Sequence, residues 1–172
     1  MSSIRPIADD AIQPRSFEFT KENLAECEKH IAKYPEGRQQ SAVMPILYIA
    51  QRQHDGWIPR AAIEAIAEML KMPFIRVFEV ATFYTMYNLA PIGKYHIQIC
   101  GTTPCMLCGS DDIIKACRDE LGLKIGETSE DGKFTLTELE CLGACSNAPM
   151  IQVTTTEWDH YFEDLNYERM IA

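Results

Sequence analysis

The sequence predicts an α+β chain in which a helical bundle precedes a small α/β domain. Hydrophobic residues recur with the period of helices over residues 17–90 and then, after Pro91, with the alternation typical of strands. The charge changes at the same place, because residues 17–90 carry a net charge of -1 and residues 91–172 carry -8. We therefore expect a domain boundary near residue 90. Residues 1–16 show little apolar pattern and are expected to form a flexible N-terminal segment.

Four helices are expected in the bundle, each bounded by residues that cap or break helices. In the first, Leu24, Cys27 and Ile31 fall on one face, so Cys27 is expected in the core. Pro45 lies inside the second and must occupy its first turn or kink it. The expected helices run from Thr20 to about Pro35, up to about His54, from Arg60 to Lys71, and onward from Pro73.

The second domain is expected to contain a strand, a helix and a β-hairpin. Apolar residues alternate with polar ones from Tyr95 to Ile99, as in a half-buried strand. Thr103 as N-cap and Pro104 at the first helical position predict a helix to about Leu121. This order is typical of a reduced thioredoxin fold, and a lobe of about 80 residues gains from a metal that crosslinks it. The later strands are expected at residues 135–140 and 150–155, the second returning into Tyr161 and Phe162.

The composition and the length of the apolar runs argue against several classes of function. A net charge of -9 leaves no basic footprint for nucleic acid. The longest apolar run, Ala42 to Ala50, is far shorter than a membrane span, so no direct membrane insertion is expected. The N-terminus lacks the apolar centre of a secretory signal, which favours a cytoplasmic protein. Its seven cysteines are then expected to be reduced thiols or metal ligands rather than disulfides.

Four cysteines form two close pairs at the ends of predicted strands, Cys100-x4-Cys105 and Cys141-x3-Cys145. A [2Fe-2S] cluster takes two thiolates for each iron, and two neighbouring loops can each supply one pair. Cys105 also falls in the first turn of its predicted helix, where free N–H groups stabilise a thiolate. The intervening residues are small enough for backbone N–H groups to approach sulfur: Gly101, Thr102, Thr103, Gly143, Ala144, Ser146 and Asn147.

Other uses of these cysteines remain open at this point. Four thiolates can hold a structural zinc ion, although x4 with x3 is looser than the usual zinc spacing. Cys108 completes the start of a plant-type ferredoxin spacing, and with Cys105 it forms the C-x-x-C of a thiol-disulfide oxidoreductase. Spacing alone excludes neither. We prefer the interpretation that uses both pairs, since the plant-type pattern leaves Cys141 or Cys145 idle and the dithiol leaves both unexplained.

The sequence resembles a known family from Phe17 onward, the E-type, thioredoxin-like [2Fe-2S] subunit of respiratory complex I, NADH:quinone oxidoreductase. The resemblance implies that Cys100 and Cys105 bind one iron and Cys141 and Cys145 the other, with Cys108 not a ligand. The stretches that carry it are Ala81-Thr-Phe-Tyr-Thr-Met86, Cys100-Gly-Thr-Thr-Pro-Cys-Met-Leu107 and Glu140-Cys-Leu-Gly-Ala-Cys-Ser-Asn-Ala-Pro-Met150.

The resemblance also implies partners. FMN and NADH would bind a flavoprotein subunit, and the assembly would belong to a larger respiratory complex on the cytoplasmic side of the inner membrane. Similar subunits serve NAD-linked hydrogenases and formate dehydrogenases, so the final electron acceptor stays open. The chain itself has no nucleotide-binding fingerprint and no complete active site, so we expect it to store or pass single electrons.

Overall fold

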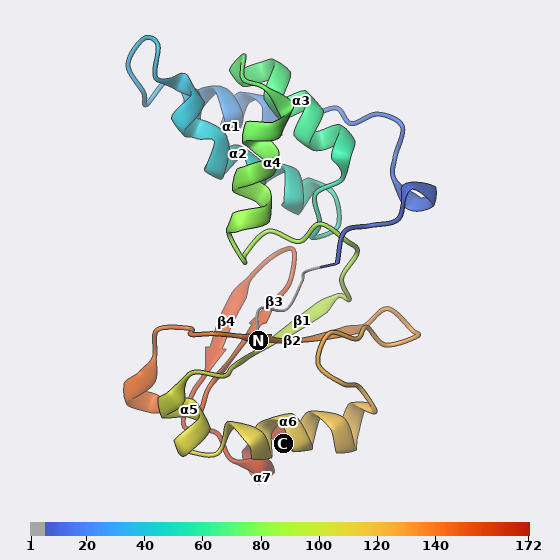
Figure 1. The fold of residues 1–172 in the computed structure, drawn as a ribbon, viewed down its shortest axis with the longest axis vertical. Coiled ribbons are helices and arrows are strands. Elements are labelled where there is room, and N and C mark those ends of the chain that lie inside the picture. Colours follow the sequence, from blue (N-terminus) through green and yellow to red (C-terminus); the bar gives the residue numbers. More distant parts are fainter. Residues whose placement is uncertain (1–5) are drawn as a thin grey trace. The chain divides into compact units, whose positions relative to one another are not determined.

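The computed structural model describes residues 6–172, which divide into two compact units, one ending at Pro91 and one spanning Ile92–Ala172 (Figure 1). Of the segment expected to be flexible, residues 1–5 lie outside the described residues. Residues 6–16 include a short 3-10 helix, η1 (Asp10–Ile12), and the Ala8 N–H donates to the Leu89 carbonyl at 2.8 Å. Between residues 6 and 172 no helix is long and apolar enough to cross a membrane.

The first unit contains the four predicted helices. The Thr20 hydroxyl accepts the Asn23 N–H at 3.2 Å and caps the first, and Pro73 stands at the N-cap of the last. Pro45 lies in the first turn of its helix, where a proline leaves the hydrogen-bond ladder intact. The elements are α1 (Lys21–Ile31), η2 (Gln39–Ala42), α2 (Val43–Gln53), α3 (Arg60–Leu70) and α4 (Phe74–Phe83).

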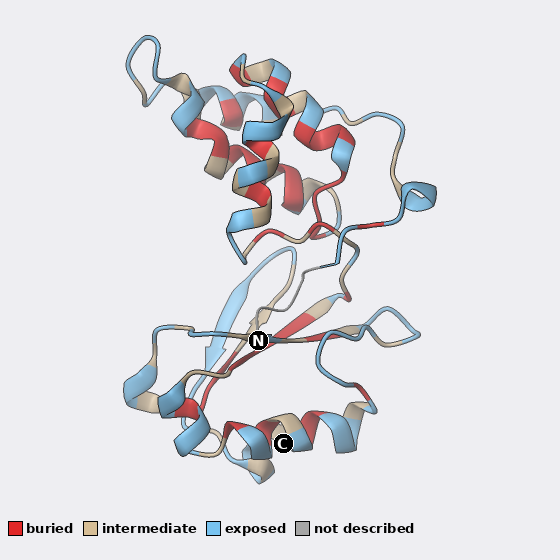
Figure 2. Cartoon of the chain, in the orientation of Figure 1, coloured by how far each residue is buried: buried red, intermediate tan, exposed pale blue. Residues whose placement is uncertain are grey.

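These helices enclose one hydrophobic core, drawn as the buried inner faces in Figure 2. Cys27 is fully buried in it, as predicted, but Leu24, which was expected on the same face, is 40% exposed. Tyr87 is also fully buried, and its hydroxyl donates to the Met44 carbonyl at 2.9 Å. Phe83, the last residue of α4, is by contrast 77% exposed.

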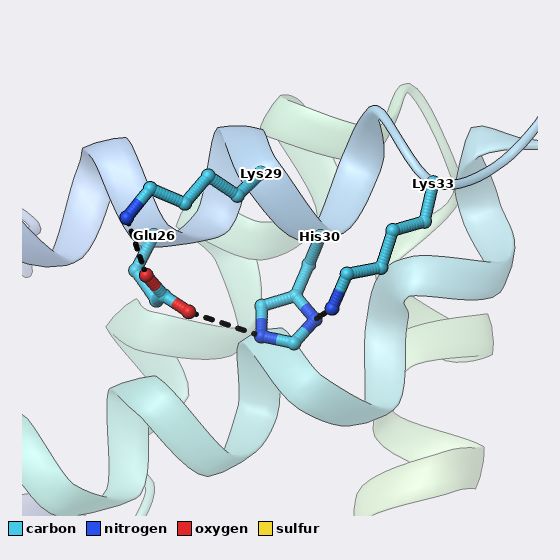
Figure 3. Close-up of polar contacts among 4 residues, drawn as sticks. All are labelled: Glu26, Lys29, His30 and Lys33. Atoms are coloured by element: carbon cyan, nitrogen blue, oxygen red, sulfur yellow. Dashed lines mark hydrogen bonds and ion pairs between the residues drawn. The ribbon is translucent and has the colours of Figure 1, made fainter.

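A chain of polar contacts runs along the C-terminal half of α1 and just past its end (Figure 3). Glu26 contacts Lys29 at 3.1 Å and the His30 Nε2 at 3.5 Å, while Lys33 approaches the His30 Nδ1 at 3.2 Å. The hydrogen bond from Lys29 lowers the pKa of the Glu26 carboxyl. Basic residues in the last turn also complement the helix dipole.

The second unit is a four-stranded sheet with strand order β2-β1-β3-β4 (Figure 1). Strand β1 pairs in parallel with β2, from Tyr95↔Phe134 to Cys100↔Leu139, and antiparallel with β3. Helix α6 (Ser110–Leu121) packs on the sheet, and its residues Ile113 and Cys117 are buried against Ile99 and Leu136. The strands are β1 (Tyr95–Cys100), β2 (Phe134–Leu139), β3 (Ile151–Thr154) and β4 (Asp159–Phe162).

Two details of the second unit differ from the prediction. Strand β1 is not half-buried, because His96 and Gln98 are buried as well as the apolar residues. Their polar atoms are satisfied inside the sheet, His96 Nε2 by the Thr137 hydroxyl at 2.8 Å and Gln98 Oε1 by the Thr154 hydroxyl at 3.2 Å. Burial raises the cost of charging an imidazole and lowers the pKa of His96 to about 4.

The single helix expected from Thr103 to Leu121 is two helices. The first, α5 (Thr103–Leu107), has Thr102 rather than Thr103 at its N-cap, and the second is α6 (Ser110–Leu121). Gly109 separates them at φ 106°, a left-handed conformation that continues no α-helix. A short helix at the C-terminus, α7 (Tyr167–Ile171), was not predicted.

Candidate metal centre

The ends of three strands meet where the first cysteine pair lies. The Cys100 N–H donates to the Met150 carbonyl at 3.2 Å, and the Gly101 N–H donates to the Leu139 carbonyl at 2.8 Å. Cys100 is the last residue of β1, and Cys105 lies in the first turn of α5, so the two thiols are separated only by the strand-to-helix turn. The fold of the sheet therefore fixes the first pair.

This first pair is buried. Cys100 is 1% exposed and Cys105 is 0% exposed, and both pack with Met150 in a small apolar cluster. Leu142, Ala144 and Ala148, from the loop that carries the second pair, close this cluster from the other side. The loop after β2 thus lies directly against the loop after β1.

The second pair is exposed on this same loop. The Sγ atoms of Cys141 and Cys145 lie 4.0 Å apart, and Cys145 begins a short 3-10 helix, η3 (Cys145–Asn147). The Gly143 N–H donates to the Cys141 Sγ at 3.3 Å, as expected from the small residues in this loop. Gly143 has φ 81°, a conformation that glycine adopts without strain.

Cys105 and Cys145 are each influenced by thiols of both pairs. Burial, with added effects of Cys100 and Cys145, raises the pKa of Cys105 to about 11. The hydrogen bond with Cys141 raises the pKa of Cys145, and the charge of Cys100 adds to this. Protein groups alone therefore disfavour the thiolate forms of Cys105 and Cys145, and bound cations would have to stabilise them.

The donor set fits two irons. The thiols come as two pairs, and four thiolates are the protein ligands of a [2Fe-2S] cluster. Within residues 6–172, no three His, Cys, Asp or Glu side chains are grouped closely enough to hold a metal ion as they stand. The structure places Cys100 and Cys105 against the loop that carries Cys141 and Cys145, so the two pairs selected from the sequence lie on neighbouring loops.

Cys108 follows Cys105 by three residues and belongs to neither close pair. It is the exposed C-cap residue of α5, and its N–H donates to the Pro104 carbonyl at 3.0 Å. An attacking thiol needs exposure and a lowered pKa. Cys105 has neither, because it is fully buried and its pKa is raised. These properties disfavour a Cys105–Cys108 dithiol enzyme.

Two hydrogen bonds that hold the loop of Cys141 and Cys145 were not predicted from the sequence. The Tyr161 hydroxyl donates to the Leu142 carbonyl at 3.0 Å, which ties β4 to the residue after Cys141. The Asp164 N–H donates to the Asn147 carbonyl at 2.9 Å, which ties the loop's other end to the chain after β4. Neither contact has a local sequence signal, because both partners come from distant positions.

The class of the protein follows from these two cysteine pairs on neighbouring loops at the strand ends. It is a small α/β protein whose thiols are suited to hold iron. The sequence model of the family described as thioredoxin-like [2Fe-2S] ferredoxin matches residues 27–172, and the chain belongs to this family. This membership confirms the predicted fold class and supports an iron–sulfur cofactor.

Relatives with established names are similar over most of the chain. The E subunit of the NADH-quinone oxidoreductase of Rickettsia conorii is 57% identical over 155 residues, which are 90% of each chain. An E subunit of the same enzyme from Rhizobium meliloti is 52% identical over 169 residues, 98% of this chain and 60% of the relative.

A solved structure has the same fold. The air-oxidized NAD+-reducing [NiFe]-hydrogenase matches 74% of this chain with a TM-score of 0.61 and 16% sequence identity. The present chain covers only 21% of that hydrogenase chain. At this identity the likeness describes the fold alone.

Proposed function

We propose that this chain is the subunit of an NADH:quinone oxidoreductase that holds one [2Fe-2S] cluster and exchanges single electrons with the FMN of a partner flavoprotein. The observation that carries the proposal is the approach of two cysteine pairs on adjacent loops of the sheet. Relatives that share more than half of its residues bear the name of this oxidoreductase, which favours a quinone-linked assembly over a hydrogenase.

Each group of residues has its own task in this proposal. Cys100 and Cys105 would bind one iron in the apolar cluster with Met150, and Cys141 and Cys145 would bind the other at the surface. The bound cluster would supply reversible one-electron chemistry. The Gly143 N–H stabilises negative charge on the Cys141 sulfur, and the apolar cluster keeps water from the inner pair.

The surface position of the outer pair suits electron exchange with a partner. Cys141 and Cys145 are exposed, whereas the inner pair is shielded by protein. The short route for an electron therefore passes through the outer pair. FMN and NADH would bind the flavoprotein, which would also connect this chain to the membrane-bound part of the complex on its cytoplasmic side.

The test begins with the chain purified without oxygen. We expect about two iron and two acid-labile sulfide per chain, and a red-brown colour. Zinc without sulfide would overturn the proposal in favour of a structural zinc module. NADH should reduce the cluster only when the flavoprotein partner is present. Reduction of the isolated chain by NADH would contradict the proposal that NADH reacts on the flavoprotein.

A further inference from the structure

Strand β4 leaves one edge of the sheet open. The opposite edge, β2, is covered by residues 126–129, since Leu136 exchanges backbone hydrogen bonds with Glu127 at 3.0 Å and Gly126 at 2.7 Å. Along β4 no described residue donates or accepts a backbone hydrogen bond from the outer side. All four of its residues are exposed, as Figure 2 shows.

The register identifies the backbone groups that face outward. The Thr155 N–H donates to the Trp158 carbonyl at 2.8 Å and closes the hairpin with β3. Antiparallel pairs alternate between bonded and non-bonded, so His160 and Phe162 bond to β3. The N–H and C=O groups of Asp159 and Tyr161 therefore point away from the sheet and can accept another strand.

The side chains of β4 also suit an added strand. Trp158, His160 and Phe162 lie on one face, with ring centres 6.4 Å and 4.8 Å apart along the row. Trp158 is 43% exposed and Phe162 is 42% exposed. Edge strands are usually protected from pairing by a short length, charged side chains, proline or a bulge, and of these β4 has only its short length and Asp159. Aromatic side chains instead offer cross-strand contacts.

Charge selects the occupant of this edge. Glu157, Asp159 and Glu163 flank the aromatic row, and none of them takes part in an ion pair within residues 6–172. Pairing two copies of β4 would bring three carboxylates from each copy together, and like charges across a strand pair are destabilising. A segment with lysine or arginine would instead find complementary charge.

We propose that β4 is the docking edge for an extended basic segment of a partner polypeptide, which adds to the sheet as a fifth strand. The outward groups of Asp159 and Tyr161 supply the hydrogen bonds, and the aromatic row supplies side-chain contacts. The proposal rests on the proposed place of this chain in an assembly, but not on the cofactor. Because the Tyr161 hydroxyl holds the Leu142 carbonyl, the docked strand would lie beside the loop of Cys141 and Cys145.

Residue-resolved hydrogen exchange tests the edge in the full chain and in its purified assembly. The Asp159 and Tyr161 amides should exchange rapidly in the isolated chain and at least a hundredfold more slowly in the assembly. The His160 and Phe162 amides, bonded to β3, serve as internal controls that are protected in both. Protection of Asp159 and Tyr161 in the isolated chain, or rapid exchange in the assembly, would overturn the proposal.

Two substitutions at one position separate the hydrogen bond from the charge. Asp159→Pro removes the outward N–H and leaves the β3 bonds in place, so the affinity for the partner should fall about fivefold or more. Asp159→Asn keeps the N–H, so it should weaken binding less and flatten its dependence on salt. Equal affinities for wild type and Asp159→Pro, with circular dichroism showing both folded, would refute strand addition.

A photo-crosslinker identifies the occupant. With benzoylphenylalanine in place of Phe162, the crosslinked peptide from the assembly should come from another polypeptide and carry net positive charge. A crosslink to a second copy of this chain, to its own residues 6–91, or to an acidic segment would each overturn the proposed occupant.

Discussion

The Sγ atoms of Cys141 and Cys145 lie 4.0 Å apart on the exposed loop that follows β2. Because each iron would have only two protein thiolates, Cys141→Ser should abolish the cluster or leave it labile. Visible absorption and iron content measure the outcome. Cys27→Ser is the matched control, since Cys27 lies in the helical unit, and it should keep the full spectrum. An unaltered spectrum in Cys141→Ser would remove this residue from the ligand set.

Cys108→Ser distinguishes the proposed ligand set from the two alternatives that use this sulfur. Cys108 is exposed at the end of α5, outside the cluster of Cys100, Cys105 and Met150. The variant should therefore keep its iron, its sulfide and its visible spectrum. Loss of the cluster would favour the plant-type ligand pattern. We expect the wild type not to reduce the disulfides of insulin. If it does, and if Cys108→Ser loses this activity, the result would favour the dithiol.

The reduction potential should be low, because acidic residues on the elements around the centre oppose the addition of an electron. Asp111, Asp112, Glu138 and Glu140 are all exposed there. In a redox titration followed by electron paramagnetic resonance, we expect a signal only under strong reductant. Reduction by ascorbate would contradict the expectation.

A pair of variants on α6 measures the contribution of charge. Asp112→Asn, in the first turn of the helix, should raise the potential by an amount on the order of tens of millivolts at low salt. Glu120→Gln removes the same charge roughly 12 Å farther along the helix and should change the potential less. Equal shifts would show that only net charge matters.

His96 predicts how the stability of the second unit depends on pH. Burial lowers its pKa from 6.5 to about 4, so below pH 6.5 the unfolded chain binds a proton that the folded chain does not. The free energy of unfolding should therefore fall as the pH drops from 6.5 towards 4, by about 3 kcal/mol at most. His96→Gln should flatten this dependence in urea unfolding of the cluster-free chain. The same slope in both proteins would contradict it.

Gly93→Ala should destabilise the start of the sheet. A Cβ at Gly93 would lie 2.7 Å from two backbone atoms of Phe134, which cannot move without displacing β2. We expect a loss of about 1–3 kcal/mol in thermal or urea unfolding. Gly101→Ala is the comparison, since the three atoms nearest its Cβ all belong to the Glu138 side chain, which can rotate away. A smaller loss in Gly93→Ala than in Gly101→Ala would refute the backbone overlap.

Local signals predicted most of the elements but not the break between α5 and α6. Thr20, Pro45 and Pro73 act on their own helices, and the structure confirms each role. Between Thr103 and Leu121 the helical spacing of apolar residues continues across Gly109. This spacing alone therefore predicts a single helix. The left-handed conformation of Gly109 ends α5 and starts α6 in a new direction.

The sequence allowed us to select the residues of the candidate site, but not to predict how deeply each of them is buried. Cys100, Cys105, Cys141 and Cys145 stand out because close pairs at strand ends are uncommon by chance. Their unequal burial depends on Met150 and on the loop that covers Cys100, which are contacts between distant parts of the chain. The assignment of these four residues as ligands stays a prediction until the variants are measured.

The position of β1 in the sheet bears on when this unit can mature in the cell. It is the first strand of its unit to be synthesised, yet it lies between β2 and β3, whose partner residues extend to Thr154. During translation Cys100 and Cys105 therefore leave the ribosome long before the strands that bring Cys141 and Cys145 beside them. Iron and sulfide would be inserted after synthesis of the unit, when a completed sheet presents all four thiols together.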